Sequence, residues 1–300
     1  MRFVVVVTGA PPGGEETEER IRALVAGEPR LDIAAARWLA PKEACELDIE
    51  LAGSAARGFV DRLQPFAESA RLDIAIVPAA GRRKALLISD MDSTIIGQEC
   101  IDEMADVVGR KREVAAVTER AMRGELPFEA ALEARLALLK GVTTVDLERV
   151  FERRISLMPG ARTLVQTMRA NGAYTALVSG GFTFFTSRVA KAVGFDMHRA
   201  NTLELAGETM TGRVVQPILG REAKREMLEG LVSARGIAPA ATLAVGDGAN
   251  DLAMIRQAGL GVAFRAKPIV AAEAHAAIRH GDLTALLYLQ GYARSEFATV

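Results

Sequence analysis

The chain of 300 residues contains only two cysteines, Cys45 and Cys100, too few for a disulfide framework or a cysteine-rich metal site. Two reduced thiols in a cytoplasmic protein are the simplest expectation. No apolar stretch approaches the roughly 18 residues that cross a membrane. The apolar run at the start, MRFVVVVTG, has no room for the three regions of a signal peptide. The sequence therefore predicts a cytoplasmic protein without a membrane partner.

An excess of charge of one sign is also missing. The sequence has 37 Lys and Arg residues and 38 Asp and Glu residues, which gives a formal charge of -1. This balance provides no general attraction to nucleic acid, so we expect no nucleic-acid partner. What is present is an ordinary globular composition, 50% hydrophobic and 25% charged, without repeats or low-complexity tracts. A chain of this length can form one large domain or two modest ones.

The first 80 residues have the order strand, helix, strand, strand, helix, strand. The predicted strands are 2–8, 31–40, 44–53 and 72–79, and the predicted helices are 15–27 and 54–70, the second distorted at Pro65. This order is the ferredoxin-like pattern. It resembles the ACT family of small-molecule regulatory modules. The resemblance implies a regulatory or dimerisation domain over residues 1–80, and with it a homodimer, followed by a linker at 79–84.

The rest of the chain alternates strands and helices. Short apolar runs at 85–89, 173–179, 242–246 and 260–264 predict strands, and helical segments separate them. Such alternation favours an α/β fold, with a Rossmann-like parallel sheet covered on both faces, over residues 84–300. Residues 97–157 contain helical patterns and no convincing strand, so we expect a helical cap inserted after the first strand. Residues 200–216 predict a β-hairpin that turns near Gly207.

Two carboxylates follow the first of these strands directly. In LLISDMDSTI, residues 86–95, the apolar run ends at Asp90 and Asp92. Ligands of open α/β sheets lie beyond the carboxyl ends of the strands. Two carboxylates on the same side of an extended chain raise each other's pKa, and a cation such as Mg²⁺, which prefers oxygen ligands, relieves the repulsion. On this motif alone, an Asp that caps a helix stays an open alternative.

Three further segments add polar groups at comparable places. TLAVGDGANDLAMI, residues 242–255, is another strand that ends in carboxylates, Asp247 and Asp251. In ALVSGGF, Ser179 precedes two glycines whose backbone N–H groups suit a phosphate oxygen. Lys224 lies near the start of a helix. The alternatives are turns that cap helices and, for the lysine, a solvated surface position.

Together, DMDST, SGG, Lys224 and GDGAND have the order and approximate spacing of the haloacid dehalogenase superfamily of phosphatases. Over about residues 84–285 the chain is most similar to the phosphoserine phosphatase family. The resemblance implies that Asp90 is a nucleophile that forms an aspartyl phosphate and that Asp92 donates and accepts the proton. It also implies a Mg²⁺ ion and a set of ligands and phosphate contacts: Asp90, the backbone carbonyl of Asp92 and Asp247 on the metal, Asp251 as a supporting carboxylate, and Ser179, Gly180, Lys224 and Asn250 around the phosphate.

The same resemblance places the substrate's amino-acid end in the cap. Glu99 resembles the anion that would bind the ammonium of phosphoserine, Arg135 the fork-shaped cation for its carboxylate, and Phe128 an apolar wall. Without the family, Glu99 and Arg135 are expected to be solvated side chains. The implied reaction is hydrolysis of O-phospho-L-serine to L-serine and phosphate, the last step of serine biosynthesis. Two alternatives remain: a related phosphatase or phosphotransferase for another small metabolite, and a regulatory amino-acid-binding protein with a relic site.

Overall fold

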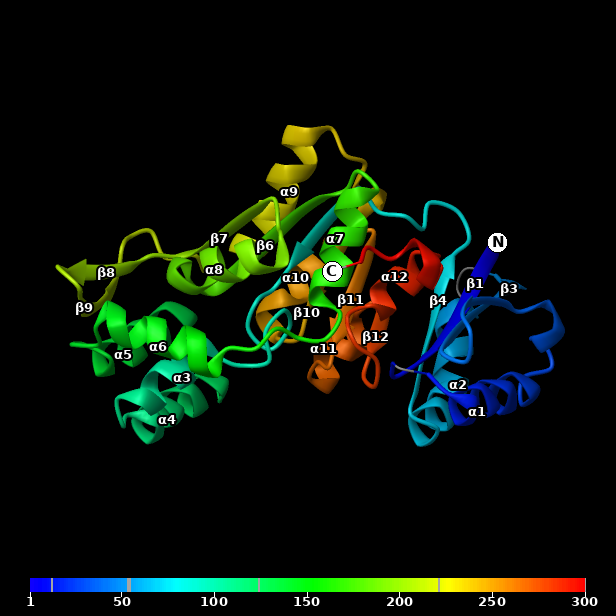
Figure 1. Cartoon of the computed structure of the whole chain (residues 1–300), viewed down its shortest axis with the longest axis horizontal. Helices are drawn as coiled ribbons and strands as arrows, with labels where there is room; N and C mark the ends of the chain where they lie inside the picture. Colours follow the sequence, from blue (N-terminus) through cyan, green and yellow to red (C-terminus); the bar gives the residue numbers. More distant parts are fainter. Residues whose placement is uncertain (12, 53–54, 124, 221, 300) are drawn as a thin grey trace.

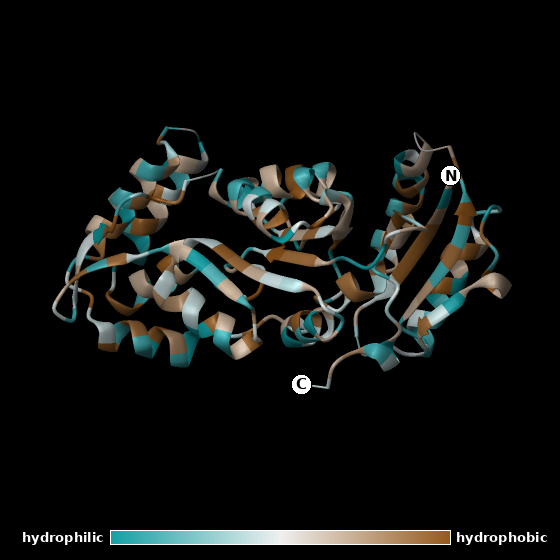
Figure 2. Ribbon diagram, turned by 90° about the horizontal axis from the view of Figure 1, so that it is seen from above, coloured by the Kyte–Doolittle hydropathy of each residue, from teal (hydrophilic) through white to brown (hydrophobic). Residues whose placement is uncertain are grey.

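An antiparallel sheet formed by the N-terminal residues lies beside a larger parallel sheet in the computed structural model (Figure 1). The structure describes residues 1–11, 13–52, 55–123, 125–220 and 222–299. No helix in these ranges is both long and apolar enough to cross a membrane. Hydrophobic residues are concentrated along the strands of both sheets, while the helices carry hydrophilic residues on their outer sides (Figure 2).

The N-terminal sheet has the strand order β2-β3-β1-β4, and all its pairs are antiparallel. Its elements are β1 (Arg2–Gly9), α1 (Glu15–Ala26), β2 (Arg37–Ala40), β3 (Ala44–Glu50), α2 (Ala56–Ser69) and β4 (Leu72–Pro78). This arrangement matches the predicted ferredoxin-like pattern and is consistent with an ACT-like domain. Helix α2 runs through Pro65 without a break.

One predicted strand of this sheet is wrong in its first half. Residues 31–40 were expected to form a single strand, but only Arg37–Ala40 does so. Ile33–Ala35 is a short 3-10 turn, because the carboxylate of Asp32 accepts a hydrogen bond of 2.9 Å from the backbone N–H of Ala34. An Asp side chain that binds nearby backbone in this way competes with strand pairing.

Both faces of the N-terminal sheet are covered, which explains the continuous apolar run in β1. Val5 and Val7 pack under α1 and α2, whereas Val4 and Val6 belong to the buried cluster of the larger domain, together with Tyr288. Polar contacts fix this second face. The carboxylate of Asp73, on β4, accepts hydrogen bonds of 2.7 Å from the backbone N–H groups of Arg279 and Gly281.

The larger sheet is parallel, with the order β12-β11-β10-β5-β6-β7. Its strands are β5 (Leu86–Ser89), β6 (Tyr174–Phe182), β7 (Met197–Asn201), β10 (Thr242–Gly246), β11 (Leu260–Phe264) and β12 (Ala276–Ile278). Its helices are α7 (Ala161–Ala170), α8 (Thr183–Val193), α9 (Ala223–Arg235), α10 (Leu252–Gln257), α11 (Pro268–Glu273) and α12 (Ala285–Leu289). The α/β fold with a parallel sheet is therefore confirmed. Strands β7 and β12 were not predicted, because neither contains an apolar run long enough to distinguish it from a loop.

Four helices follow β5 and lie at the end of the molecule remote from the N-terminal sheet (Figure 1). They are α3 (Cys100–Val107), α4 (Lys111–Met122), α5 (Phe128–Leu138) and α6 (Thr144–Arg154). The hairpin of β8 (Leu203–Ala206) and β9 (Thr209–Val214) packs beside them and turns at Gly207, whose φ is 63°. Residue Gly141, after α5, donates a backbone hydrogen bond of 3.0 Å to Met210 of the hairpin. The hairpin thus extends the helical cap.

Candidate active site

The two acidic segments converge because their strands are neighbours in the middle of the sheet. Strand β5 pairs with β10 in parallel, with Ser89 beside Val245, so both strands end at the same edge. The backbone N–H of Asp90 donates to the carbonyl of Val245 at 3.0 Å, which extends the pairing by one residue. The next residues, Asp90 on one side and Asp247 on the other, therefore lie next to each other beyond the carboxyl edge.

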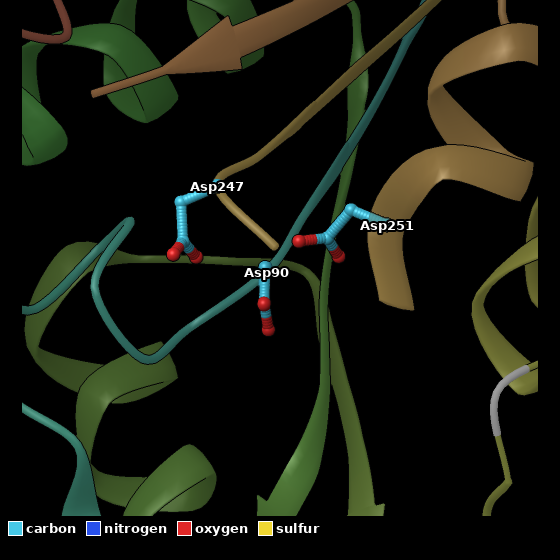
Figure 3. Close-up of side chains that lie close together, drawn as sticks. All are labelled: Asp90, Asp247 and Asp251. Atoms are coloured by element: carbon cyan, nitrogen blue, oxygen red, sulfur yellow. The ribbon is translucent and has the colours of Figure 1, made fainter. Parts of the chain in front are cut away.

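Three carboxylates gather at this edge and form what we call the carboxylate cluster, Asp90, Asp247 and Asp251 (Figure 3). One oxygen of each lies within 4.8 Å of the others. The ammonium of Lys224 lies 2.7 Å from Asp90 and 2.6 Å from Asp251. Three carboxylates and one ammonium leave two negative charges in the ionised cluster, which a divalent cation would neutralise. The donors are all carboxylate oxygens, as hard cations such as Mg²⁺ require.

Burial makes the negative charges of the cluster costly. Desolvation raises the pKa of Asp90 well above its usual value; the charge of Asp251 raises it further, and Lys224 opposes both effects. Desolvation and the charge of Asp251 also raise the pKa of Asp247, to about 6. The hydroxyl of Thr94 donates to Asp247 at 3.4 Å. A cation at the cluster would favour the ionised form of each carboxylate.

Asp92 lies apart from the cluster and points toward the turn of β6. The backbone N–H of Cys100 donates to its carboxylate at 3.4 Å. A β-carbon placed on Gly181 would lie 3.0 Å from Asp92 Oδ2, so a larger residue at 181 would crowd this carboxylate. Desolvation, and after it the charge of Glu99, raises the pKa of Asp92 to about 7. A carboxyl group with such a pKa can both donate and accept a proton near neutral pH.

The residues predicted to bind phosphate line one pocket. It is bounded by Phe128, Val178, Ser179, Gly180, Leu219, Gly220, Ala223, Lys224 and Asn250. Ser179 is buried, and its hydroxyl accepts a hydrogen bond of 2.9 Å from the N–H of Gly181, which fixes the turn. Phe128 reaches this pocket from the first turn of α5, so the cap covers the site. Sequence reasoning missed Leu219, Gly220 and Ala223, because their segment carries no chemical motif apart from the nearby lysine.

The two predicted residues for the amino-acid end of a substrate are not in direct contact. Glu99 accepts a hydrogen bond of 2.7 Å from the hydroxyl of Ser93. Arg135 is half-buried, and its Nε donates to the carbonyl of Ala131 at 3.1 Å. Within the described part of the chain, no carboxylate lies within 4.0 Å of its guanidinium. The guanidinium therefore keeps donors available for an anion. Asp102, which sequence reasoning missed, also contributes negative charge near it.

Asn250 and Asp251 both lie in the turn that follows β10. Asp251 is fully buried, and besides its ion pair with Lys224 it accepts a hydrogen bond of 3.0 Å from the N–H of Gly248. Asn250 faces the phosphate pocket. A β-carbon on Gly246 would lie 2.3 Å from the carboxyl carbon of Asp251, so only glycine fits at this point of the turn.

Comparison with known proteins places this site in a family. The model of the haloacid dehalogenase-like hydrolase family matches residues 87–256. The chain is 50% identical over 209 residues to the phosphoserine phosphatase of Albidiferax ferrireducens. The aligned region covers 68% of this chain and 88% of that protein.

Two solved structures resemble nearly the whole chain, including the N-terminal sheet. A HAD-family hydrolase of Salmonella enterica serovar Typhi matches with a TM-score of 0.83 and 29% identity, over 96% of this chain and 98% of that one. A probable phosphoserine phosphatase of Vibrio cholerae matches with a TM-score of 0.78 and 31% identity, over 98% of this chain and 88% of that one. These matches agree with the fold and with the family indicated by the sequence motifs.

Proposed function

Because the chain belongs to the haloacid dehalogenase-like hydrolase family, we propose that it hydrolyses O-phospho-L-serine to L-serine and phosphate, as the last step of serine biosynthesis. The observation that carries the proposal is the position of Asp90. It lies in the carboxylate cluster, 2.7 Å from the ammonium of Lys224, with Asp92 two residues further along the chain. The substrate is supported by the names of the relatives and by the open guanidinium of Arg135 in the cap.

In the proposed first step, a carboxylate oxygen of Asp90 attacks phosphorus and forms an aspartyl phosphate as the bond from phosphorus to the serine oxygen breaks. Asp92 gives its proton to the departing serine oxygen. In the second step Asp92 takes a proton from water, and the resulting hydroxide attacks phosphorus and releases Asp90. Both carboxyl groups return to their starting forms, so one pair of residues can serve every turnover.

The remaining residues of the site bind and balance charge. We assign Ser179, Gly180, Lys224 and Asn250 to the phosphate, and Lys224 offsets negative charge on the group in transfer. We assign Asp90 and Asp247, with the backbone carbonyl of Asp92, to Mg²⁺, and Asp251 as the supporting carboxylate of the cluster. When bound, this ion supplies positive charge that lowers the repulsion between the attacking carboxylate and the phosphate. Asp251 also supports the ammonium of Lys224 directly.

Substrate choice should depend on Arg135. We expect Arg135→Ala to lower kcat/KM for L-phosphoserine by roughly 10- to 100-fold, because a charge-assisted hydrogen bond to the substrate carboxylate is lost. Turnover of p-nitrophenyl phosphate, which has no amino-acid end, should change little. Steady-state kinetics of both substrates on the same preparation measure the difference.

Arg120→Ala is the matched control for this variant, because Arg120 lies on the neighbouring cap helix α4 and is exposed, pairing with Glu125. Arg120→Ala should leave kcat/KM unchanged for both substrates. Equal loss for both substrates in Arg135→Ala would show that the residue does not bind the serine end. A panel of phosphorylated metabolites would then identify the group that the cap selects, including an acceptor alcohol for phosphotransfer.

For residues 1–80 we propose a regulatory or dimerisation role, supported by the ACT-like strand order. The face of the sheet that carries Val4 and Val6 packs against the larger domain, so a partner would use an edge strand, β2 or β4, or the helices. Light scattering of the full chain should give the mass of a dimer, twice 32.0 kDa. The mass of a monomer at enzyme concentrations well above those of an assay would remove the dimerisation role. We place the protein in the cytoplasm, which suits its two unpaired, buried cysteines.

A further inference from the structure

The pairing of β6 with β7 is interrupted at the phosphate-binding turn. The strands pair regularly from Ala176 and Met197 to Val178 and Arg199, but the next pair is Phe182 and Asn201. Residues 179–181 of β6 therefore lie opposite residue 200 alone, which is a bulge. A bulge re-aims the residues that it contains, and here it turns Ser179 and Gly180 toward the pocket.

The side chain of Asn201 ties this bulge to a second segment of the pocket. Asn201 is 2% exposed, and its Nδ2 donates a hydrogen bond of 2.8 Å to the carbonyl of Gly180. Its Oδ1 accepts a hydrogen bond of 2.7 Å from the backbone N–H of Leu219. Leu219 lies just before α9, the helix that carries Lys224. One carboxamide thus joins two segments that both line the phosphate pocket.

The cap packs against the same two segments. A β-carbon on Gly180 would lie 3.3 Å from Cζ of Phe128, and one on Gly220 would lie 2.8 Å from Oε1 of Glu129. Phe128 and Glu129 are the first two residues of α5. The N-terminus of the cap helix therefore rests on two glycine-containing segments, and the distance between these segments is set by the hydrogen bonds of Asn201.

We propose that Asn201 is a positioning residue of the phosphate site, which holds Gly180 and Leu219 in register so that phosphate and the first turn of α5 both fit against them. The two contacts require a donor group and an acceptor atom on one short side chain, and the planar carboxamide of Asn provides both. Asp in its ionised form keeps the shape and the acceptor for Leu219 but lacks the donor for Gly180. The proposal rests on the phosphatase activity but not on the identity of the alcohol that is released.

The test compares Asn201→Asp and Asn201→Ser with the unmodified protein, using L-phosphoserine and p-nitrophenyl phosphate. We expect kcat/KM to fall roughly tenfold or more in Asn201→Asp, by the same factor for both substrates, because a buried carbonyl loses its donor and the phosphate wall shifts. The inhibition constant of inorganic phosphate should rise in parallel. Asn201→Ser, whose shorter side chain loses the contacts with both Gly180 and Leu219, should lose at least as much.

Asn171→Ala is the matched control, because Asn171 also donates a side-chain hydrogen bond to a backbone carbonyl, that of Thr167, but contacts no part of the pocket. It should lower the melting temperature without changing kcat/KM. Asn201 variants that only melt earlier, with unchanged kinetics and phosphate inhibition, would overturn the proposal, and so would a loss confined to phosphoserine. A wild-type protein that hydrolyses the aryl phosphate but not phosphoserine would refute the proposed substrate while leaving this test intact.

Discussion

Replacing Asp90 by Asn should abolish turnover, with a loss of at least about 10⁴-fold in kcat for every phosphate ester. The amide that replaces the carboxylate is a poor nucleophile, so no aspartyl phosphate can form at this position. Phosphate release from L-phosphoserine measures the loss.

The loss in Asp90→Asn should not come from unfolding. The pKa of Asp90 is raised by burial and by the charge of Asp251, so its ionised form is costly in the absence of a cation. An uncharged amide removes this cost, and Lys224 keeps its ion pair with Asp251. We therefore expect the metal-free variant to melt at least as high as the metal-free wild type. Asp106→Asn, in the cap and paired with Arg154, is the control and should stay active. Steady-state activity of the wild-type level in Asp90→Asn would rule out the covalent mechanism.

Replacing Asp92 by Asn should have the second largest effect, and its size should depend on the leaving group. We expect kcat for L-phosphoserine to fall by about 10²- to 10⁴-fold, the usual contribution of a general acid or base. The serine alkoxide needs a proton to leave, whereas p-nitrophenolate does not. The rate of the first step, observed as a burst of p-nitrophenol, should therefore be much less affected than the corresponding step with phosphoserine.

The pH dependence follows from the same carboxyl group. The pKa of Asp92 is raised to about 7, so Asp92 is protonated below this pH and ionised above it. Only the protonated form can donate to the serine oxygen, so the rate of the first step with phosphoserine should fall as the pH rises through that pKa. A bound phosphate dianion adds negative charge and shifts the fall to higher pH. In Asp92→Asn the rate of the first step should no longer fall over this pH range. If the fall persists in the variant, it must come from the titration of another group.

The carboxyl edge of the parallel sheet could be predicted because the relevant signals are local. Each apolar strand that ends in Asp90, Ser179 or Asp247 is continuous in the sequence, and parallel strands bring their ends together without further information. The ferredoxin-like order of strands and helices could be predicted for the same reason. The order of strands and helices, however, does not specify which face of the N-terminal sheet packs on the larger domain. The burial of Val4 and the hydrogen bonds that Asp73 accepts from the larger domain were therefore not predicted.

The features that sequence reasoning missed depend on side chains that meet over long separations. Asn201 and Leu219 join at the pocket only because β7 is the edge strand beside β6, and β7 itself has too little apolar character to be recognised. Asp251 was expected as a supporting carboxylate, and the structure shows that it forms a direct ion pair with Lys224. Glu99 and Arg135 were placed in the cap by resemblance alone. Their roles toward a substrate stay predictions.

The proposed reaction depends most on a divalent cation bound at the carboxylate cluster beside the nucleophile. The most direct measurement is phosphate release from L-phosphoserine by the protein treated with EDTA, before and after the addition of excess Mg²⁺. We predict no release without the ion and full recovery with it, because Asp90 and Asp247 are costly to ionise together in a buried site without a cation. Release at an equal rate in EDTA would contradict the proposed mechanism.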